Sequence, residues 1–394
     1  MPRLEPFTGY VVAPAHAARV VAPPFDTLSP EQRRAARADP DSFLGVLPPR
    51  PETGTVLEDC RRHLDHLLAA GRFEQLDGPT LAVLRLDDGR RVATGVLGDV
   101  AAERFEDGSI APHEQIRPAT VAALRRHLEV VGAVSSPVCV AHEPDDRCAE
   151  LTAAVTGGVP DVEVVDAAGS LRLWLVTDPT VRDELGAAVG ATTGWLVADG
   201  HHRAAAARPA GRVLSVLVPH DQLEIRPFHR RLPADDPTAA GARLRERGLE
   251  VIDLPGAAAP DGPGEVTVAG GGRWWRVRLP APANASDPVE ALDVVRTERH
   301  LLAPLSGGRQ RRAGPPQPLT DGPEVTAVAP TDVLDELERD GQVTVVLHPP
   351  SWAEVRAVVE AGHTMPPKST YVAPKQRSGL VVVPRPQRLP SGTR

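Results

Sequence analysis

The chain of 394 residues is poor in cysteine and contains no long apolar run. Its three cysteines, Cys60, Cys139 and Cys148, are widely spaced and odd in number, and no CxxC pair occurs. This pattern argues against a disulfide framework or a cysteine-rich zinc site, and it favours reduced thiols in a cytoplasmic protein. The first residues carry no basic stretch leading into an apolar segment, and no window approaches the roughly 18 apolar residues of a membrane span. Neither a secretory signal nor a membrane partner is therefore expected.

Positive charge and aromatic side chains are also scarce. The formal net charge is −8 and the pI is about 5.9, which argues against a broad phosphate-binding face and hence against nucleic acid as a partner. Aromatic residues make up 3% of the chain, whereas hydrophobic residues make up 41%. A core built mainly from leucine, valine and alanine is expected. The composition does not indicate an oligomeric state.

Lysine is nearly missing. Only Lys368 and Lys375 are lysines among the 44 basic residues, and both lie in one segment together with Met365 and Tyr371. A lysine ammonium is a compact charge on a long stem, and a planar guanidinium does not reproduce its geometry. The retention of both lysines in an arginine-rich chain indicates a chemical requirement for lysine here. The alternative is a chance placement in a solvated loop.

Apolar patterns predict an α+β fold with mixed sheets and helices, arranged as a single intertwined domain over residues 1–384, possibly with two lobes. The first thirty residues are broken by prolines and are expected to be extended, and residues 385–394 are expected to form a disordered tail. A mobile loop is expected at 306–323. Periodicity and capping signals predict the following elements. Helices are expected from Ser29 onward and over 56–70, 119–133, 181–190 (closed by Gly190), 287–305 and 351–362, hairpins over 81–100 and 265–280, and strands within 136–144, 171–179, 195–198, 213–218 and 344–350.

The most distinctive motif lies between an apolar strand and a helix of small residues. Glycine lets the backbone approach a ligand closely, and a helix N-terminus offers free N–H groups to phosphate. An arginine in the first turn opposes the helix dipole, so we expect it to serve a ligand rather than the helix. The alternative is a solvated turn. One metal ion is not expected to bind both histidines, because neighbours on a helix point about 100° apart. The motif consists of Asp199, Gly200, His201, His202 and Arg203.

Two further segments carry candidate functional groups. His113 and Glu114 stand just before a helix, where a carboxylate beside an imidazole suits general-base chemistry and Arg117 could hold an anionic substrate. The alternative is an ordinary approach to a helix N-terminus. Near the start, Pro23-Pro24-Phe25-Asp26 forms a rigid loop with one carboxylate that faces either a ligand or solvent. The paired Trp274 and Trp275 are expected to alternate faces of a hairpin and to serve packing.

In this order the motifs resemble those of the domain-of-unknown-function 1015 family. The segments are PPFD (23–26), PHEQIRP (112–118), VADGHHR (197–203) and MPPKSTYVAPKQRSGL (365–380), so the resemblance spans most of the chain. The DGHHR element also looks like the phosphate-binding turn of the ParB/sulfiredoxin superfamily, and within it like that of free-serine kinases. The resemblance implies a core that contains a strand, the GHHR turn and a helix.

The resemblance implies a nucleotide-dependent kinase that uses ATP or ADP and Mg²⁺ to phosphorylate a small, serine-like hydroxyl amino acid. Asp199 to Arg203 match the turn that binds the nucleotide phosphates, and Lys368 is expected to reach the same phosphates. The metal ligands are not defined, although Asp199 and Asp26 are candidates. The expected catalytic residues are Glu114, His113 and Lys368, and the expected substrate-binding residues are Arg117, Asp26, Ser369, Thr370 and Lys375.

Some positions depart from the family pattern, notably Phe25, Ile116, Ala204 and Val372, which lack hydroxyl or aromatic groups that relatives carry. The residues expected to bind phosphate match the family pattern, whereas the specificity of the site for its substrate is expected to differ. His201 stands where sulfiredoxins carry a reactive cysteine, so that activity is disfavoured. The alternatives are a nucleotide-binding regulatory protein without phosphoryl-acceptor chemistry, and a structural protein in which the motifs are folding devices.

Overall fold

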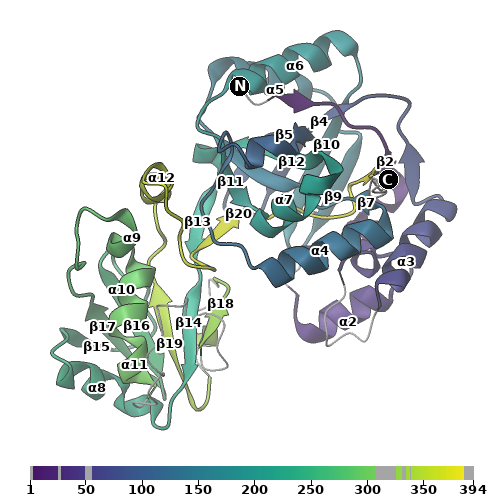
Figure 1. Cartoon of the computed structure of the whole chain (residues 1–394). Helices are drawn as coiled ribbons and strands as arrows, with labels where there is room; N and C mark the ends of the chain where they lie inside the picture. Colours follow the sequence, from purple (N-terminus) through teal and green to yellow (C-terminus); the bar gives the residue numbers. More distant parts are fainter. Residues whose placement is uncertain are drawn as a thin grey trace, which may run out of the picture. The chain divides into compact units, whose positions relative to one another are not determined.

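The computed structural model describes residues 3–24, 28–48, 56–306, 325–330, 334–337 and 339–385 (Figure 1). They form helices and mixed sheets, which confirms the predicted α+β class. The backbone contacts define two compact units, each built from segments far apart in sequence. The first unit contains Met1–Pro112, Ile116–Glu224 and Ala373–Arg394, and the second contains His113–Gln115 and Ile225–Val372. The single intertwined domain over residues 1–384 stays a prediction.

A nine-stranded sheet forms the centre of the first unit. The hairpin expected over 81–100 is confirmed as β4 (Leu81–Asp87) and β5 (Val92–Ala101), which pair antiparallel. The sheet is mixed. Its strand β8 runs parallel to β12 and antiparallel to β11. In order the strands are β6 (Ala111–Pro112), β11 (Leu196–Asp199), β8 (Val138–His142), β12 (Arg212–Pro219), β5, β4, β10 (Gly169–Val176) and β9 (Val162–Asp166), with β1 (Leu4–Glu5) beside β5.

Helices pack around this sheet. Ser29 caps the second helix through a capping box with Gln32, as its sequence predicts. The helix α4 packs between α3 and α7 (Figure 1). A smaller sheet has the order β3 (Phe73–Gln75), β2 (Tyr10–Val12), β21 (Val381–Pro384), β7 (Ala133–Val134). The helices are α1 (Ala17–Val20), α2 (Pro30–Ala38), α3 (Leu57–Ala69), α4 (Pro118–Val131), α5 (Asp146–Thr156), α6 (Pro179–Ala191) and α7 (His201–Ala207).

The core of the first unit is largely aliphatic, as the composition predicts. It contains buried leucines and valines of β4, β5, β8 and β12 together with Trp174 and Trp195. Two local predictions for this unit are wrong. The extended start contains the short helix α1, and Gly190 lies inside α6 rather than closing it, because Thr192 is the C-cap.

The second unit has a six-stranded sheet in the order β15 (Val251–Leu254), β17 (Arg273–Arg278), β16 (Glu265–Gly270), β19 (Gln342–Leu347), β14 (His229–Pro233), β18 (Thr326–Val328). Both tryptophans of the β16–β17 hairpin, Trp274 and Trp275, are buried, which confirms their packing role. Most residues of the two-stranded sheet of β13 (Glu224–Pro227) and β20 (Thr370–Ala373) belong to this unit. The remaining helices include α8 (Ala240–Glu246) and α12 (Trp352–Glu360).

The long helix expected over 287–305 is instead three short ones, α9 (Pro288–Ala291), α10 (Asp293–His300) and α11 (Leu302–Leu305). Leu292 has extended backbone angles and interrupts the first two, so the prediction is wrong. The expected loop lies outside the described residues except for Ser306. Arg385, the first residue of the expected tail, pairs with Asp99, and residues 386–394 lie outside the described part.

None of the helices in the described ranges combines the length and the apolar composition needed to cross a membrane.

Candidate functional site

The strand, turn and helix predicted around the DGHHR motif are present in the first unit. The strand β11 ends at Asp199, and α7 begins at His201. Gly200 joins them with φ 97°, in the left-handed region that favours glycine. A Cβ atom at Gly200 would lie 2.9 Å from Nη2 of Arg203, so a larger residue at this position would displace the guanidinium.

Two cations converge on the carboxylate of Asp199. Arg203 donates from Nη2 to Oδ2 over 2.5 Å, and Lys375 donates from Nζ to Oδ1 over 2.7 Å. Burial would raise the pKa of Asp199, but the charges of Lys375 and Arg203 outweigh it and hold this pKa well below its usual range. Asp199 is therefore ionised at neutral pH. One negative and two positive charges give the cluster a net charge of +1.

We expect Asp199→Asn to lower the free energy of unfolding by roughly 2 kcal/mol at pH 7, because both cations lose their charged partner. A carboxyl with a depressed folded pKa stabilises the fold above its unfolded pKa of about 4, and this contribution is lost as pH falls further. The difference between the two proteins should thus shrink below about pH 4. Urea midpoints at several pH values measure it. The control Asp183→Asn, at a side chain 71% exposed, should change little, and equal midpoints at pH 7 would contradict the prediction.

Arg203 has a structural role that the sequence argument did not foresee. Its Nη1 donates to the carbonyl oxygen of Pro137 over 2.8 Å, just before β8, while Nη2 holds Asp199 at the end of β11. These contacts join two strand ends, and the predicted role of Arg203 toward a ligand stays a prediction. A guanidinium has five N–H groups, so Arg203 can hold these two acceptors and still donate to an anion.

The two histidines of the motif lie in different surroundings. His201 is buried, and His202 is half-buried and accepts a hydrogen bond at Nε2 from the backbone N–H of Arg117 over 3.0 Å. This bond joins the start of α7 to the N-cap of α4 and leaves the ring proton of a neutral His202 on Nδ1. Arg117 thus lies next to the motif, and its role in substrate binding stays a prediction.

The described residues form no preassembled metal cage, although Mg²⁺ held through nucleotide phosphates would not need one. No group of three or more His, Cys, Asp or Glu side chains in the described ranges is placed to hold a metal ion. Both oxygens of Asp199 already accept from cations, so this carboxylate is not available as a metal ligand in this arrangement. Asp26, the other candidate ligand and a predicted substrate contact, lies outside the described residues.

The second unit contains the predicted catalytic pair His113 and Glu114. Glu114 forms a parallel bridge with Met365, whose N–H donates to the carbonyl oxygen of His113 over 2.7 Å. The His113 side chain is completely buried, and its Nε2 lies 2.8 Å from Oγ1 of Thr370. In this arrangement His113 fixes the Thr370 hydroxyl, and its catalytic role stays a prediction.

Lys368 is exposed and has φ 58°, the one positive φ among the described residues other than glycine. Its ammonium lies 4.7 Å from the centre of the Phe228 ring, a cation–π geometry. The neighbouring Ser369 is buried and donates from Oγ to the carbonyl oxygen of Pro366 over 2.6 Å. The backbone around Lys368 is therefore held by its neighbours, whereas Lys368 as a whole is exposed.

Arg230 is the residue that the sequence argument missed. It is 0% exposed, pairs with Glu298 and donates from Nη1 to the carbonyl oxygens of Lys368 and Phe228 over 3.0 and 3.2 Å. Burial lowers the pKa of Arg230, and the carboxylates of Glu298 and Glu114 oppose this change. Arg230 thus holds the backbone that carries Lys368. No sequence signal distinguishes it from the many other arginines of the chain.

The predicted site residues fall into two sets. Asp199 to Arg203, Arg117 and Lys375 belong to the first unit, whereas Glu114, His113, Lys368, Ser369 and Thr370 belong to the second. Lys375, rather than Lys368, is the lysine that contacts the DGHHR motif. The position of Lys368 at the phosphates stays a prediction from the sequence.

The fold and the site thus define this chain as an α+β protein with a charged strand–turn–helix motif. The model of the family described as "Protein of unknown function (DUF1015)" matches residues 4–295, and the chain belongs to this family. A search of the curated proteins finds no match.

Several solved structures show weak similarity to the chain. A conserved hypothetical protein from Pyrococcus furiosus is 16% identical with a TM-score of 0.37, over 73% of this chain and 95% of its own. A free serine kinase in complex with AMP is 16% identical with a TM-score of 0.37, over 72% and 91%. SbnI from Staphylococcus aureus, truncated at its C-terminus, is 16% identical with a TM-score of 0.38, over 73% and 87%. The fold and site described above do not depend on these similarities.

Proposed function

We propose that the chain is a small-molecule kinase that binds ATP or ADP and transfers a phosphoryl group to the hydroxyl of a serine-like amino acid. The observation that carries the proposal is the half-buried cluster of Asp199, Arg203 and Lys375, with a net charge of +1. Lys375 belongs to the MPPKSTYVAPKQRSGL motif and contacts Asp199 of the DGHHR motif, 176 residues away in the sequence. In this proposal the two segments together form the position that binds the nucleotide phosphates.

Arg203 and Lys375 neutralise the nucleotide phosphates in this proposal. Phosphoryl transfer depends mainly on positioning and on neutralising charge, so guanidinium and ammonium donors are suited to it. Glu114 accepts the proton of the substrate hydroxyl, whose oxygen bonds to the transferred phosphorus as the bond to the nucleotide oxygen breaks. Arg117 contacts the substrate in this proposal, whereas the buried Ser369 and Thr370 hydroxyls are hydrogen-bonded within the protein and support the surrounding segment. Mg²⁺ accompanies the nucleotide in the assay, and no step is assigned to it.

Nucleotide binding is tested by thermal unfolding with ADP, ATP or AMP and Mg²⁺. At a ligand concentration 100-fold above Kd the native state gains about 2.7 kcal/mol, which corresponds to a rise in Tm on the order of 5 °C. We expect Arg203→Ala and Lys375→Ala each to weaken ADP binding about tenfold or more, because each removes a charged donor. Each variant is compared with its own Tm without ligand.

The matched control is Arg172→Ala, which removes an arginine from an exposed pair with Glu163 and should leave the ADP-induced shift unchanged. An unchanged Tm of the wild-type protein with millimolar concentrations of every nucleotide would refute the proposal. Nucleotide binding without transfer to any hydroxy amino acid would instead indicate a regulatory nucleotide-binding protein.

A further inference from the structure

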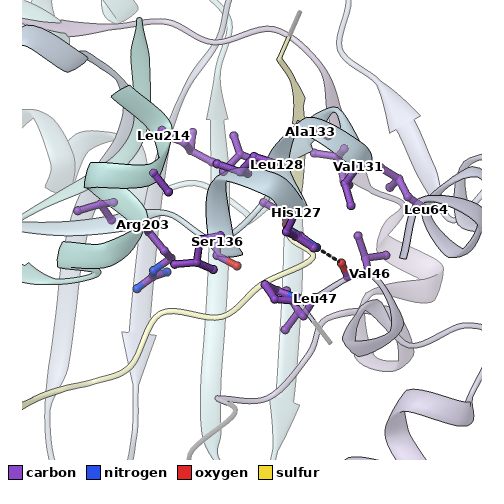
Figure 2. Close-up of a pocket in the computed structure, with 18 of the residues that line it drawn as sticks. Val46, Leu47, Leu64, His127, Leu128, Val131, Ala133, Ser136, Arg203 and Leu214 are labelled. Atoms are coloured by element: carbon purple, nitrogen blue, oxygen red, sulfur yellow. Dashed lines mark hydrogen bonds between the residues drawn. The ribbon is translucent and has the colours of Figure 1, made fainter. Parts of the chain in front are cut away.

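The first unit contains an apolar cavity that shares only Arg203 with the proposed kinase site. The empty space beside its walls amounts to about 680 Å³, a figure that includes space open to solvent. Figure 2 shows Arg203 and Ser136 at one end and Leu64 at the other. The wall between them comes mainly from α4, α7 and the segment that precedes residue 49. Its apolar residues include Phe43, Leu64, Leu124, Leu128, Val131 and Leu214.

The polar side chains of this wall already have partners within the protein. His127 lies 2.7 Å from the carbonyl oxygen of Val46, and burial lowers its pKa, so the ring is neutral and donates this bond. Ser135 accepts at Oγ from the backbone N–H of Gly379 over 2.7 Å. The Ser136 hydroxyl lies 2.5 Å from that of Ser378. The cavity therefore offers a ligand aliphatic contact along its length and few polar groups.

We propose that this cavity binds the hydrocarbon chain of an anionic amphiphile, such as a medium-chain alkyl carboxylate. The chain lies along the apolar wall, and the carboxylate lies at the Arg203 end. That end has the complementary charge, because Arg203 belongs to the cluster whose net charge is +1. A purine or pyrimidine fits less well, since its ring nitrogens and carbonyl oxygens would lose hydrogen bonds to water on entering an apolar wall.

The inference does not rest on the proposed kinase activity, although the two ligands would share Arg203. An anion bound at Arg203 from the cavity occupies the donors that a phosphate would use. We therefore expect alkyl carboxylate and nucleotide to exclude each other. This competition gives the amphiphile a regulatory effect on any reaction that takes place at the DGHHR motif.

Calorimetric titration with sodium hexanoate, octanoate, decanoate and dodecanoate, each below its micelle concentration, tests the inference. Burying one methylene improves Kd about fourfold, so affinity should rise steadily with chain length until the cavity is filled. Decanol, with the same chain and no charge, should bind at least tenfold more weakly than decanoate. Affinity that does not depend on chain length would overturn the inference.

Two substitutions that fill the cavity locate the site. Leu124→Trp adds an indole from the half-buried face of α4, and Ala206→Leu adds a side chain from α7. Each should weaken decanoate binding at least tenfold without changing the binding of inorganic pyrophosphate. The matched control Leu151→Trp changes a half-buried helix residue that does not line the cavity and should bind decanoate normally.

The outcomes separate this inference from the proposed function. If decanoate binds the two variants as tightly as the wild-type protein, the inference fails even if nucleotides bind. Three results together would show that a nucleobase occupies the cavity. Decanoate would not bind, ADP would bind at least tenfold more tightly than pyrophosphate, and Leu124→Trp would abolish the difference between ADP and pyrophosphate. Either result overturns the hydrocarbon assignment. If one variant does not fold by circular dichroism, the other supplies the test.

Discussion

Replacing Arg230 by methionine is expected to lower the free energy of unfolding by about 3–5 kcal/mol. Arg230 is 0% exposed, and its partner Glu298 is largely covered, with a side chain 11% exposed. The substitution leaves the charge of Glu298 without its ion-pair partner in the protein interior. It also removes the donor to the carbonyl oxygens of Lys368 and Phe228. Removing one member of a buried pair costs far more than removing both.

Urea unfolding followed by tryptophan fluorescence measures this loss, because Trp274 and Trp275 lie in the same unit as Arg230. The double variant Arg230→Met, Glu298→Gln should be more stable than Arg230→Met alone, since the unpaired charge is gone. The control Arg278→Met removes an arginine that is 67% exposed and should stay within about 0.5 kcal/mol of the wild-type protein. A loss below about 1 kcal/mol for Arg230→Met would show that the buried pair contributes little.

Local signals were sufficient to predict the strand–turn–helix motif. An apolar run up to Ala198, a glycine at position 200 and a run of small residues define three elements whose backbone geometry depends on near neighbours. The antiparallel hairpin of β4 and β5 was predictable for the same reason. The interruption at Leu292 was not predictable, because the apolar spacing of residues 287–305 continues across the break in backbone angles.

Long-range partners could not be read from the sequence. Lys375 pairs with Asp199 across 176 residues of sequence, and neither motif contains a local pattern that predicts this contact. The scarcity of lysine drew attention to the correct segment, but it could not decide which lysine contacts the DGHHR motif. Arg230 illustrates the opposite case. The burial of Arg230 follows from the tertiary packing of β14. In an arginine-rich sequence, nothing local distinguishes a buried arginine from the exposed ones.

Glu114→Gln is expected to reduce the rate of phosphoryl transfer about 10²–10⁴-fold, the range that general-base catalysis contributes. The amide preserves the shape of the side chain, and the bridge of Glu114 to Met365 is made by the backbone, so the fold should be retained. Loss of the carboxylate leaves the substrate hydroxyl without a proton acceptor. The rate of formation of phosphorylated amino acid from ATP or ADP, with a panel of hydroxy amino acids, measures the effect.

A purely structural role for Glu114 would give a different result. If the Glu114 carboxylate acts as the base, its protonation causes the fall in rate on the acid side of the pH–rate profile. This fall should disappear in Glu114→Gln, while ADP binding stays unchanged. A structural role would instead lower Tm and leave the shape of the profile intact. The control Glu129→Gln, at a side chain 53% exposed on α4, should transfer phosphate at the wild-type rate. If Glu114→Gln retains at least half of the wild-type rate, the base must be another group, because an amide cannot accept the proton at neutral pH.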